Sequence, residues 1–252
     1  MTDKIALITG GSRGLGKEMA LRIAEKGACV VITYVSQKEA AENVVKEIEQ
    51  MGKEAAALYF DANDVSSIKE FVKNFEETIQ KKWNVGKFDF LINNAGAGAN
   101  IPFEKATEEN FDWFMNIHFK SVYFLTQQLL PLLNDHGRII NISSGSTKYS
   151  IPGYTMYASM KGAIETLTPY LAKELGSRGI TVNVVAPGPV ETDFNNGSNR
   201  DFPDRKKLLA SRAAMGRVGL AKDIGGVIAF LCSEDARWIT GERIEVSGGI
   251  NL

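Results

Sequence analysis

Two residues four positions apart carry the clearest chemical signal in the chain. Tyr157 and Lys161 lie in a stretch of helical periodicity, in which residues i and i+4 share one face. A phenol is a weak acid with an ordinary pKa of about 10, and a neighbouring ammonium lowers that pKa because it favours the tyrosinate. We therefore expect Tyr157 to act as a general acid or base, assisted by Lys161.

A hydroxyl group precedes this pair in the sequence. Ser144 stands at the end of the apolar run Arg138–Ser143. Such a hydroxyl can hydrogen-bond to a carbonyl oxygen and orient it. Each feature alone is common, because a serine after a strand usually begins a turn and Tyr–Lys pairs occur on many helices. Their significance depends on what else the chain contains.

A glycine-rich loop, Thr9–Gly16, lies between the first apolar run and the first helical stretch. Glycines let a backbone turn tightly and approach a pyrophosphate, and the N-terminus of the following helix offers N–H donors to the phosphates. The loop is not a P-loop, because Glu18 stands where a magnesium-binding Ser or Thr is needed. The strict dinucleotide-binding pattern G-x-G-x-x-G is also absent, because Met19 stands at the position of its last glycine. We predict a nucleotide-binding loop of another type.

Short apolar runs rich in Val and Ile alternate with longer helical stretches. The predicted strands are Ile5–Thr9, Cys29–Tyr34, Ala55–Phe60, Phe88–Asn93, Arg138–Ser143, Thr181–Ala186 and Arg243–Ser247. The predicted helices are Leu15–Glu25, Lys38–Met51, Ser66–Lys82, Asn110–Leu133, Tyr157–Gly176 and Lys222–Ser233. Most strands lack polar alternation, so helices should cover both faces of the sheet. We predict an α/β fold: one domain, residues 1–252, with a doubly wound, parallel, seven-stranded sheet of Rossmann-like type.

One region departs from this alternation. Residues 193–215 include several Asn, Asp, Gly and Ser residues and Pro203. We predict a polar, mobile loop there, which either covers the substrate or is an ordinary surface loop. The variable part of the pocket should come from Phe194–Leu208 and from residues near Ser146–Tyr154.

The pattern Thr-Gly-x-x-x-Gly-x-Gly in the loop resembles that of the short-chain dehydrogenases/reductases. Further motifs match this family in its order along the chain. They are Asn93-Asn94-Ala95-Gly96, Asn116, Ser144 with Tyr157-x-x-x-Lys161, and Pro187-Gly188. Together they indicate the short single-domain type of the family, similar to 3-oxoacyl-thioester reductases and broad-range carbonyl (ketone) reductases.

The resemblance implies hydride transfer between a nicotinamide cofactor and a carbonyl carbon. Tyr157 would protonate the carbonyl oxygen and Ser144 would orient it. Lys161 would also hold the nicotinamide ribose, and Asn116 would pass protons to the lysine through water. The enoyl reductases of the superfamily space their Tyr and Lys more widely, which favours C=O over C=C reduction here. The implied cofactor-binding residues are Gly10, Ser12, Arg13, Gly14, Leu15, Gly16, Tyr34, Ser36, Asp61, Ala62, Asn94, Ala95, Gly96, Tyr157, Lys161, Pro187, Gly188, Val190 and Thr192.

The end of the second predicted strand distinguishes the two nicotinamide cofactors. NAD-binding folds often place an acidic residue there to bind the ribose hydroxyls, but this chain has Tyr34 and Ser36 and no carboxylate. Arg13, inside the glycine loop, could donate to a 2′-phosphate. Both observations favour NADPH over NADH.

Composition excludes several other classes of function. The 29 basic and 30 acidic residues nearly cancel, so neither nucleic acid nor an anionic membrane is expected as the main partner. The sequence contains no run of uncharged apolar residues long enough to span a membrane, and we expect a soluble cytoplasmic protein. Cys29 and Cys232 form no motif, and the two histidines give no basis for a metal site. His118 is expected to be a helix or core residue.

Three functions remain open. The first is NADPH-dependent reduction of a ketone or 3-oxoacyl-type substrate. Because Asn134-Asp135-His136 places acid where a carrier-protein reductase would need base, a free small-molecule ketone or alcohol is favoured, although Arg178 could supply one charge. The second is NAD-dependent oxidation of a sugar, steroid or dihydrodiol alcohol, and the third is a non-catalytic nucleotide-binding regulator. By resemblance, a homotetramer packed through the helices of Asn116 and Tyr157 is expected.

Overall fold

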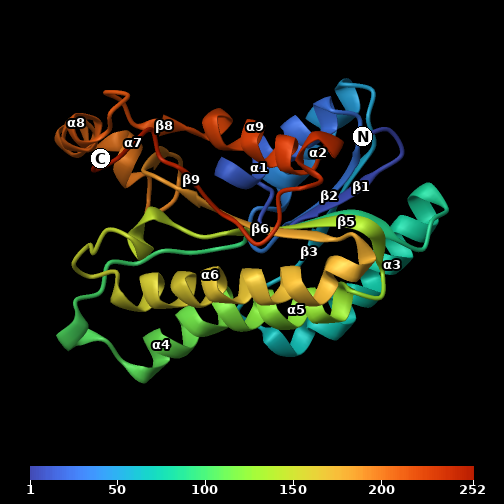
Figure 1. Ribbon diagram of the computed structural model, residues 1–252, viewed down its shortest axis with the longest axis horizontal. Helices are drawn as coiled ribbons and strands as arrows, with labels where there is room; N and C mark the ends of the chain where they lie inside the picture. The colour runs from blue at the N-terminus through green and yellow to red at the C-terminus, as the bar shows by residue number, and fades with distance from the viewer.

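The computed structural model describes residues 1–252, and its centre is a parallel sheet of seven strands (Figure 1). The strands are β1 (Ile5–Ile8), β2 (Cys29–Tyr34), β3 (Ala55–Tyr59), β4 (Phe88–Asn93), β5 (Leu133–Ile142), β6 (Thr181–Pro187) and β9 (Arg243–Val246). They lie in the order β3-β2-β1-β4-β5-β6-β9. The order reverses between β1 and β4, and in doubly wound sheets the carboxyl ends of the strands at such a point form a ligand crevice.

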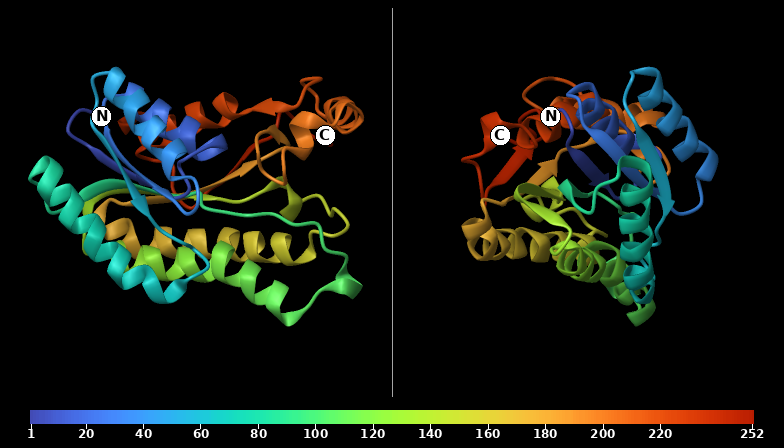
Figure 2. Two further views of the ribbon diagram at one scale, coloured as in Figure 1. Left: turned by 180° about the vertical axis from the view of Figure 1, so that it is seen from behind. Right: turned by 90° about the vertical axis from the view of Figure 1, so that its right-hand side faces the viewer.

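Helices cover both faces of the sheet, as predicted (Figures 1 and 2). On one face lie α1 (Gly14–Glu25), α2 (Lys38–Gln50) and α9 (Ala221–Leu231). On the other lie α3 (Ile68–Trp83), α4 (Glu108–Met115), α5 (Ser121–Leu129) and α6 (Thr155–Leu175). Single 3-10 turns occupy Val65–Ser67, Phe103–Lys105, Gly145–Thr147, Gly176–Arg178 and Glu234–Ala236. No helix combines the length and the hydropathy that a membrane crossing needs.

Alternate residues of each central strand enter different cores. In β1, Ala6 and Ile8 pack into the larger core beneath α1, α2 and α9, whereas Ile5 and Leu7 pack into the core beneath α3, α5 and α6. Successive side chains of a strand point to opposite faces, so a strand buried on both faces must be apolar at every position. This explains why the strand runs show no polar alternation.

The predicted helix Asn110–Leu133 is divided in the structure. The helix starts earlier, because the Thr107 hydroxyl oxygen accepts a hydrogen bond from the Asn110 N–H, and the Thr107 N–H donates to the Asn110 side-chain oxygen in return. A π-helical segment, Asn116–Lys120, separates α4 from α5. At the other end Leu133 pairs with Phe88 and begins β5, so tertiary strand pairing overrides the helical periodicity of the sequence.

The segment predicted as a polar loop contains regular structure. After β7 (Val190–Glu191) come α7 (Ser198–Asp201) and α8 (Pro203–Arg212), and β8 (Gly219–Leu220) pairs with β7. The left-handed residues Asn195, Asn196 and Gly197 turn the chain sharply. Pro203 stands at the first turn of α8, where its missing N–H costs no helix bond.

Candidate active site

The glycine loop lies over the carboxyl end of β2 and delivers the chain to the start of α1. The Gly10 N–H donates to Thr33 Oγ1 and the Gly11 N–H to the Thr33 carbonyl, both at 2.9 Å. A Cβ on Gly16 would lie 2.1 Å from the Gly10 carbonyl oxygen. The turn therefore requires glycine at position 16, and it brings the α1 N-terminus to the pocket, where its free N–H groups can meet a phosphate.

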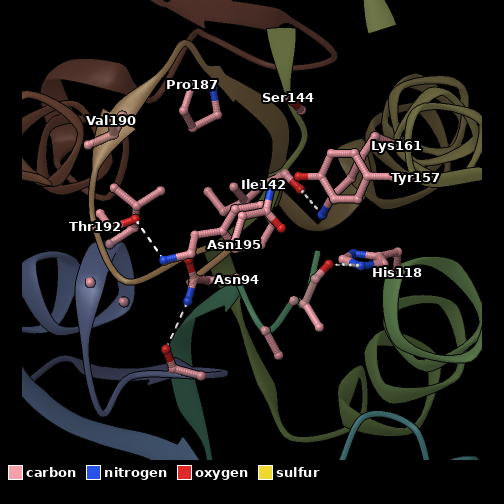
Figure 3. Close-up of a pocket in the computed structure, with 18 of the residues that line it drawn as sticks. Asn94, His118, Ile142, Ser144, Tyr157, Lys161, Pro187, Val190, Thr192 and Asn195 are labelled. Carbon is pink, nitrogen blue, oxygen red and sulfur yellow. Dashed lines mark hydrogen bonds between the residues drawn. The ribbon is translucent and has the colours of Figure 1, made fainter. Parts of the chain in front are cut away.

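Asn94 connects the loop to the end of β4. Its side-chain amide donates to the carbonyls of Thr9 and Gly10 at 2.9 and 3.0 Å, and its N–H donates to Thr9 Oγ1 at 3.0 Å (Figure 3). These bonds join the two strands on either side of the reversal point. Asn94 therefore fixes the shape of the glycine loop, in addition to lining the crevice itself.

A pocket of about 500 Å³ runs along the carboxyl edge of the sheet. Every residue predicted to bind the cofactor lines it, from the glycine loop through Tyr34 and Ser36 to Thr192. Ser144, Tyr157 and Lys161 line the same pocket. The glycine-rich loop at a helix N-terminus fits the phosphate end of a dinucleotide, and the phenol–ammonium pair fits its nicotinamide end.

Tyr157 and Lys161 lie in the first two turns of α6, and both are buried. The Lys161 Nζ donates to the carbonyl of Ile142, the last residue of β5, at 2.7 Å (Figure 3). The same nitrogen is 5.7 Å from the centre of the Tyr157 ring. The ammonium is thus held beside the phenol by the strand end rather than by a direct bond to it.

The predicted lowering of the Tyr157 pKa is not found. Burial raises the pKa of the phenol to about 12, although the neighbouring Ser144 hydroxyl acts in the opposite direction. Burial also lowers the pKa of Lys161 to about 8. Both shifts have the same main cause: removing a group from water disfavours its charged form. At neutral pH the phenol therefore carries its proton.

The loop that bears Ser144 is tied to α6. Glu165, one turn after Lys161, accepts hydrogen bonds from Ser143 Oγ at 2.6 Å and Thr147 Oγ1 at 2.8 Å. Arg243 Nε on β9 donates to the same carboxylate oxygen at 2.8 Å. These bonds on both sides of Ser144 fix the serine relative to the helix that carries Tyr157.

Asn116 is the one predicted catalytic residue that the structure does not bring to the pocket. It is the first residue of the π-helical segment, and it does not line the pocket. His118, two residues later, does line it, with its ring 5.0 Å from the ring of Tyr157. The water-mediated role expected of Asn116 stays a prediction, and His118 is a pocket residue as well as a core residue.

An apolar and aromatic wall completes the pocket beyond Tyr157. It is formed by Ile151, Tyr154 and Phe194. The Asn195 side-chain amide donates to the Tyr154 hydroxyl at 2.8 Å, which joins the segment after β7 to the start of α6. The sequence placed these residues in the right segments, but no motif identified them individually.

From α8, Arg205, Leu209 and Arg212 also line the pocket. They belong to the segment whose helical structure the prediction missed. The polar sequence gave no periodic apolar pattern there, because α8 has no buried residues. Because these three side chains line the pocket, α8 lies where the substrate loop was predicted.

Comparison with known proteins agrees with this architecture. A family model described as enoyl-(acyl carrier protein) reductase matches residues 10–251. The hydroxynaphthalene reductase-like protein Arp2 of Metarhizium brunneum is 35% identical over 260 residues, which cover 99% of this chain and 95% of that protein. The chain therefore belongs to the short-chain dehydrogenase/reductase family.

Two solved structures are closely similar. The reductase LugOII, described as catalysing keto-reduction at C1 in lugdunomycin biosynthesis, has a TM-score of 0.95 and 37% identity, and the match covers 100% of this chain and 99% of that one. The angucycline C-6 ketoreductase LanV with bound NADP has a TM-score of 0.95 and 36% identity, covering 100% and 96%. Both relatives are ketoreductases of the same single-domain form.

Proposed function

We propose that this protein is an NADP(H)-dependent carbonyl reductase that transfers a hydride from NADPH to the carbonyl carbon of a ketone. The observation that carries the proposal is that Ser144, Tyr157 and Lys161 line one pocket with the glycine loop. The naming of two close relatives as ketoreductases supports it. The description of the matching family model names an enoyl reductase. Tyr157 and Lys161 are only four residues apart, however, which is closer than in enoyl reductases and favours C=O reduction.

The residues divide the work of reduction between them. Bound NADPH supplies the hydride. Ser144 donates a hydrogen bond to the substrate oxygen and holds the carbonyl in line. Tyr157, protonated because of its pKa of about 12, gives its proton to that oxygen as negative charge develops there. The Lys161 ammonium stabilises the tyrosinate left behind, and the same group can hold the nicotinamide ribose.

Arg13 supports the preference for NADPH. It lines the pocket beside Tyr34 and Ser36, at the end of β2, where no carboxylate stands to repel a 2′-phosphate. We expect Arg13→Ala to raise the KM for NADPH by about 10- to 100-fold and to change the KM for NADH less than twofold, because a charge-assisted phosphate bond is worth about 1.5–3 kcal/mol. Initial rates over a range of each cofactor measure this. An equal effect on both cofactors would rule out the phosphate contact.

The structure favours a free small-molecule ketone over an acyl chain on a carrier protein. Arg178 is paired with Asp135 at 2.8 Å and also donates to the Leu130 carbonyl, so its charge is not directed to an acidic partner. The wall of Tyr154 and Phe194 favours a flat or aromatic ketone. LanV, with 36% identity, has also been solved with NADP and rabelomycin, which is consistent with this class.

A spectrophotometric panel tests the function. Aromatic ketones, aliphatic ketones and 3-oxoacyl thioesters are each supplied with NADPH or NADH at equal concentration. We expect the fastest oxidation of NADPH with aromatic or cyclic ketones. Faster NAD-dependent oxidation of sugar, steroid or dihydrodiol alcohols would instead establish the dehydrogenase alternative. NADPH binding without turnover on any substrate would establish the regulator.

Two expectations about the protein's surroundings remain predictions. One is the homotetramer packed through α4, α5 and α6. The other is a cytoplasmic location.

A further inference from the structure

Two arginines on α8 bring positive charge to the pocket. Arg205 and Arg212 both line it, and so does Leu209, which lies between them in the sequence. Residues at positions i, i+4 and i+7 of a helix share one face, so these three form the side of α8 that faces the pocket. Figure 1 shows α8 at the carboxyl edge of the sheet, near the end of the chain. The inner face of this helix is therefore cationic at both ends and apolar in the middle.

Arg205 is oriented by a contact that leaves its terminal amino groups free. Its Nε donates to Asn199 Oδ1 at 3.0 Å, and Asn199 Nδ2 donates to the carbonyl of Val190 on β7 at 3.4 Å. The two Nη groups of Arg205 make no hydrogen bond within the chain. A guanidinium fork of this kind matches the planar geometry of a carboxylate, which it can bind through two parallel hydrogen bonds.

Arg212 is held through its backbone. Its carbonyl accepts a hydrogen bond from the Asn251 N–H at 2.8 Å, and the next residue, Ala213, pairs with Ile250 in an antiparallel bridge. The guanidinium of Arg212 forms no ion pair and is exposed to solvent. The C-terminal residues thus fix the end of α8 at the pocket and leave the charged group of Arg212 free to meet a ligand.

No carboxylate of the protein neutralises these two arginines. The pocket is lined by only two acidic residues, Asp61 and Asp193. Asp193 is paired with Arg200, and Asp61 follows β3, at the end of the pocket predicted to bind adenine. The positive charge of Arg205 and Arg212 is therefore directed at whatever occupies the pocket, and it attracts an anion.

The segment that carries α8 also contacts the reactive groups. The ring of Phe194 lies 6.0 Å from the ring of Tyr157, and the Asn195 amide donates to the Tyr154 hydroxyl. A ligand that reaches Tyr157 between these aromatic rings therefore lies in the same pocket as the inner face of α8.

We propose that Arg205 and Arg212 bind a carboxylate carried by the ketone substrate, so that the enzyme reduces aromatic keto acids in preference to neutral ketones. The proposal rests on the proposed reductase function. The aromatic wall takes the ring of the substrate, and Ser144 and Tyr157 take its carbonyl. The carboxylate itself does not react: the hydride from NADPH goes to the carbonyl carbon and the Tyr157 proton to the carbonyl oxygen. Arg205 and Arg212 determine specificity and do not act in the chemical step.

Matched ketones that differ only in charge test the proposal. 4-Acetylbenzoate and 6-acetyl-2-naphthoate place a carboxylate at two distances from the ketone, and their primary amides have the same shape without the charge. For at least one acid, we expect the wild-type KM to be at least about fivefold below that of its amide. Arg205→Gln and Arg212→Gln should each raise the KM of that acid about five- to tenfold and leave the KM of the amide and the affinity for NADPH within about twofold.

Lys207→Gln is the matched control, because it removes the same charge from α8 at an exposed position that does not line the pocket. It should leave the KM of every ketone unchanged. Equal KM values for both acids and their amides in the wild type would overturn the proposal, as would an equal effect of Lys207→Gln and the two arginine variants. A loss of NADPH affinity in the arginine variants, with no change for the acids, would assign these residues to the cofactor instead and would also overturn it.

Binding of an acid that cannot be reduced separates this site from the reductase function. 2-Naphthoate and 2-naphthamide contain no ketone, and calorimetric titration into the NADP⁺ complex measures their affinities without turnover. We expect naphthoate to bind at least about fivefold more tightly than the amide, and the double variant Arg205→Gln/Arg212→Gln to lose this preference. Equal affinities in the wild type, or a preference that survives in the double variant, would overturn the proposal. If the wild-type protein reduces no ketone, the reductase function fails, and this titration alone decides whether α8 binds a carboxylate.

Discussion

At the scale of single residues, burial controls the chemistry of the site. Tyr157 and Lys161 are removed from water by α6 and by the end of β5, and each is pushed towards its neutral form. For the phenol this keeps the proton in place until negative charge develops on a substrate. For the lysine it moves the pKa into the range in which enzymes are assayed, so the lysine and not the tyrosine should set the pH dependence.

The pKa of Lys161, lowered to about 8, gives that dependence a sign. Below this pH the lysine is mostly in its charged ammonium form, which is the form that stabilises the tyrosinate. We expect kcat/KM for ketone reduction to be level below pH 8 and to fall as the pH rises above it, measured from pH 6 to 10 at saturating NADPH. Lys161→Arg keeps its charge throughout this range, so any activity it retains should lack the decline. A wild-type profile that is level up to pH 10 would contradict this assignment.

At the scale of elements, the site depends on how closely the glycine loop packs against its neighbours. Hydrogen bonds to Thr33 on β2 and from Asn94 after β4 hold the loop in place, and α1 starts directly from it. The backbone is therefore shaped before any ligand arrives, and the approach of Gly16 to the Gly10 carbonyl leaves no room for a methyl group. Preorganisation of this kind reduces the entropic cost of binding.

Gly16→Ala should therefore weaken NADPH binding by at least about tenfold, because the loop must open to accept the new Cβ. Gly226→Ala is the matched control: Gly226 is exposed on α9, and a Cβ there would meet nothing within 4 Å. The control should bind NADPH normally and be slightly more stable, since alanine is favoured over glycine in a helix by about 0.5–1 kcal/mol. Fluorescence titration and thermal unfolding measure the two effects. Normal NADPH affinity in Gly16→Ala would show that the loop is not the phosphate site.

At the scale of the whole molecule, the helices α4, α5 and α6 carry exposed aromatic side chains. Phe111 on α4, Tyr123 and Phe124 on α5 and Tyr170 on α6 are all exposed, and Tyr170 is 66% exposed. These helices form one layer in Figure 2. Exposed apolar side chains gathered on one layer are typical of a protein–protein contact. The same helices carry Tyr157, so association here would hold the catalytic helix in place.

We expect four chains of 27.6 kDa each to associate, giving a mass of about 110 kDa by light scattering after size exclusion. Phe124→Glu should reduce that mass by at least half, because it places a charge in an apolar contact. Tyr59→Glu, at the exposed edge strand β3, should leave it unchanged. A wild-type mass near that of one chain would contradict the tetramer.

The sequence predicted the parts of this molecule that are set by local chemistry. Apolar runs located all seven strands of the main sheet, and the glycine pattern located the nucleotide end of the pocket. It missed α8, because a helix with no buried residue leaves no periodic apolar signal. It also did not predict the π turn at Asn116–Lys120, because such a turn has no composition of its own.

Replacing Tyr157 by Phe tests the central assignment most directly. The variant keeps the ring that packs against His118 and Phe194 and removes only the proton donor. With the best ketone from the panel and saturating NADPH, we expect kcat to fall by about 10²–10⁴-fold, the range that general acid catalysis supplies, while NADPH affinity stays within about twofold of wild type. A Phe variant that reduces the ketone at close to the wild-type rate would show that the proton comes from another group.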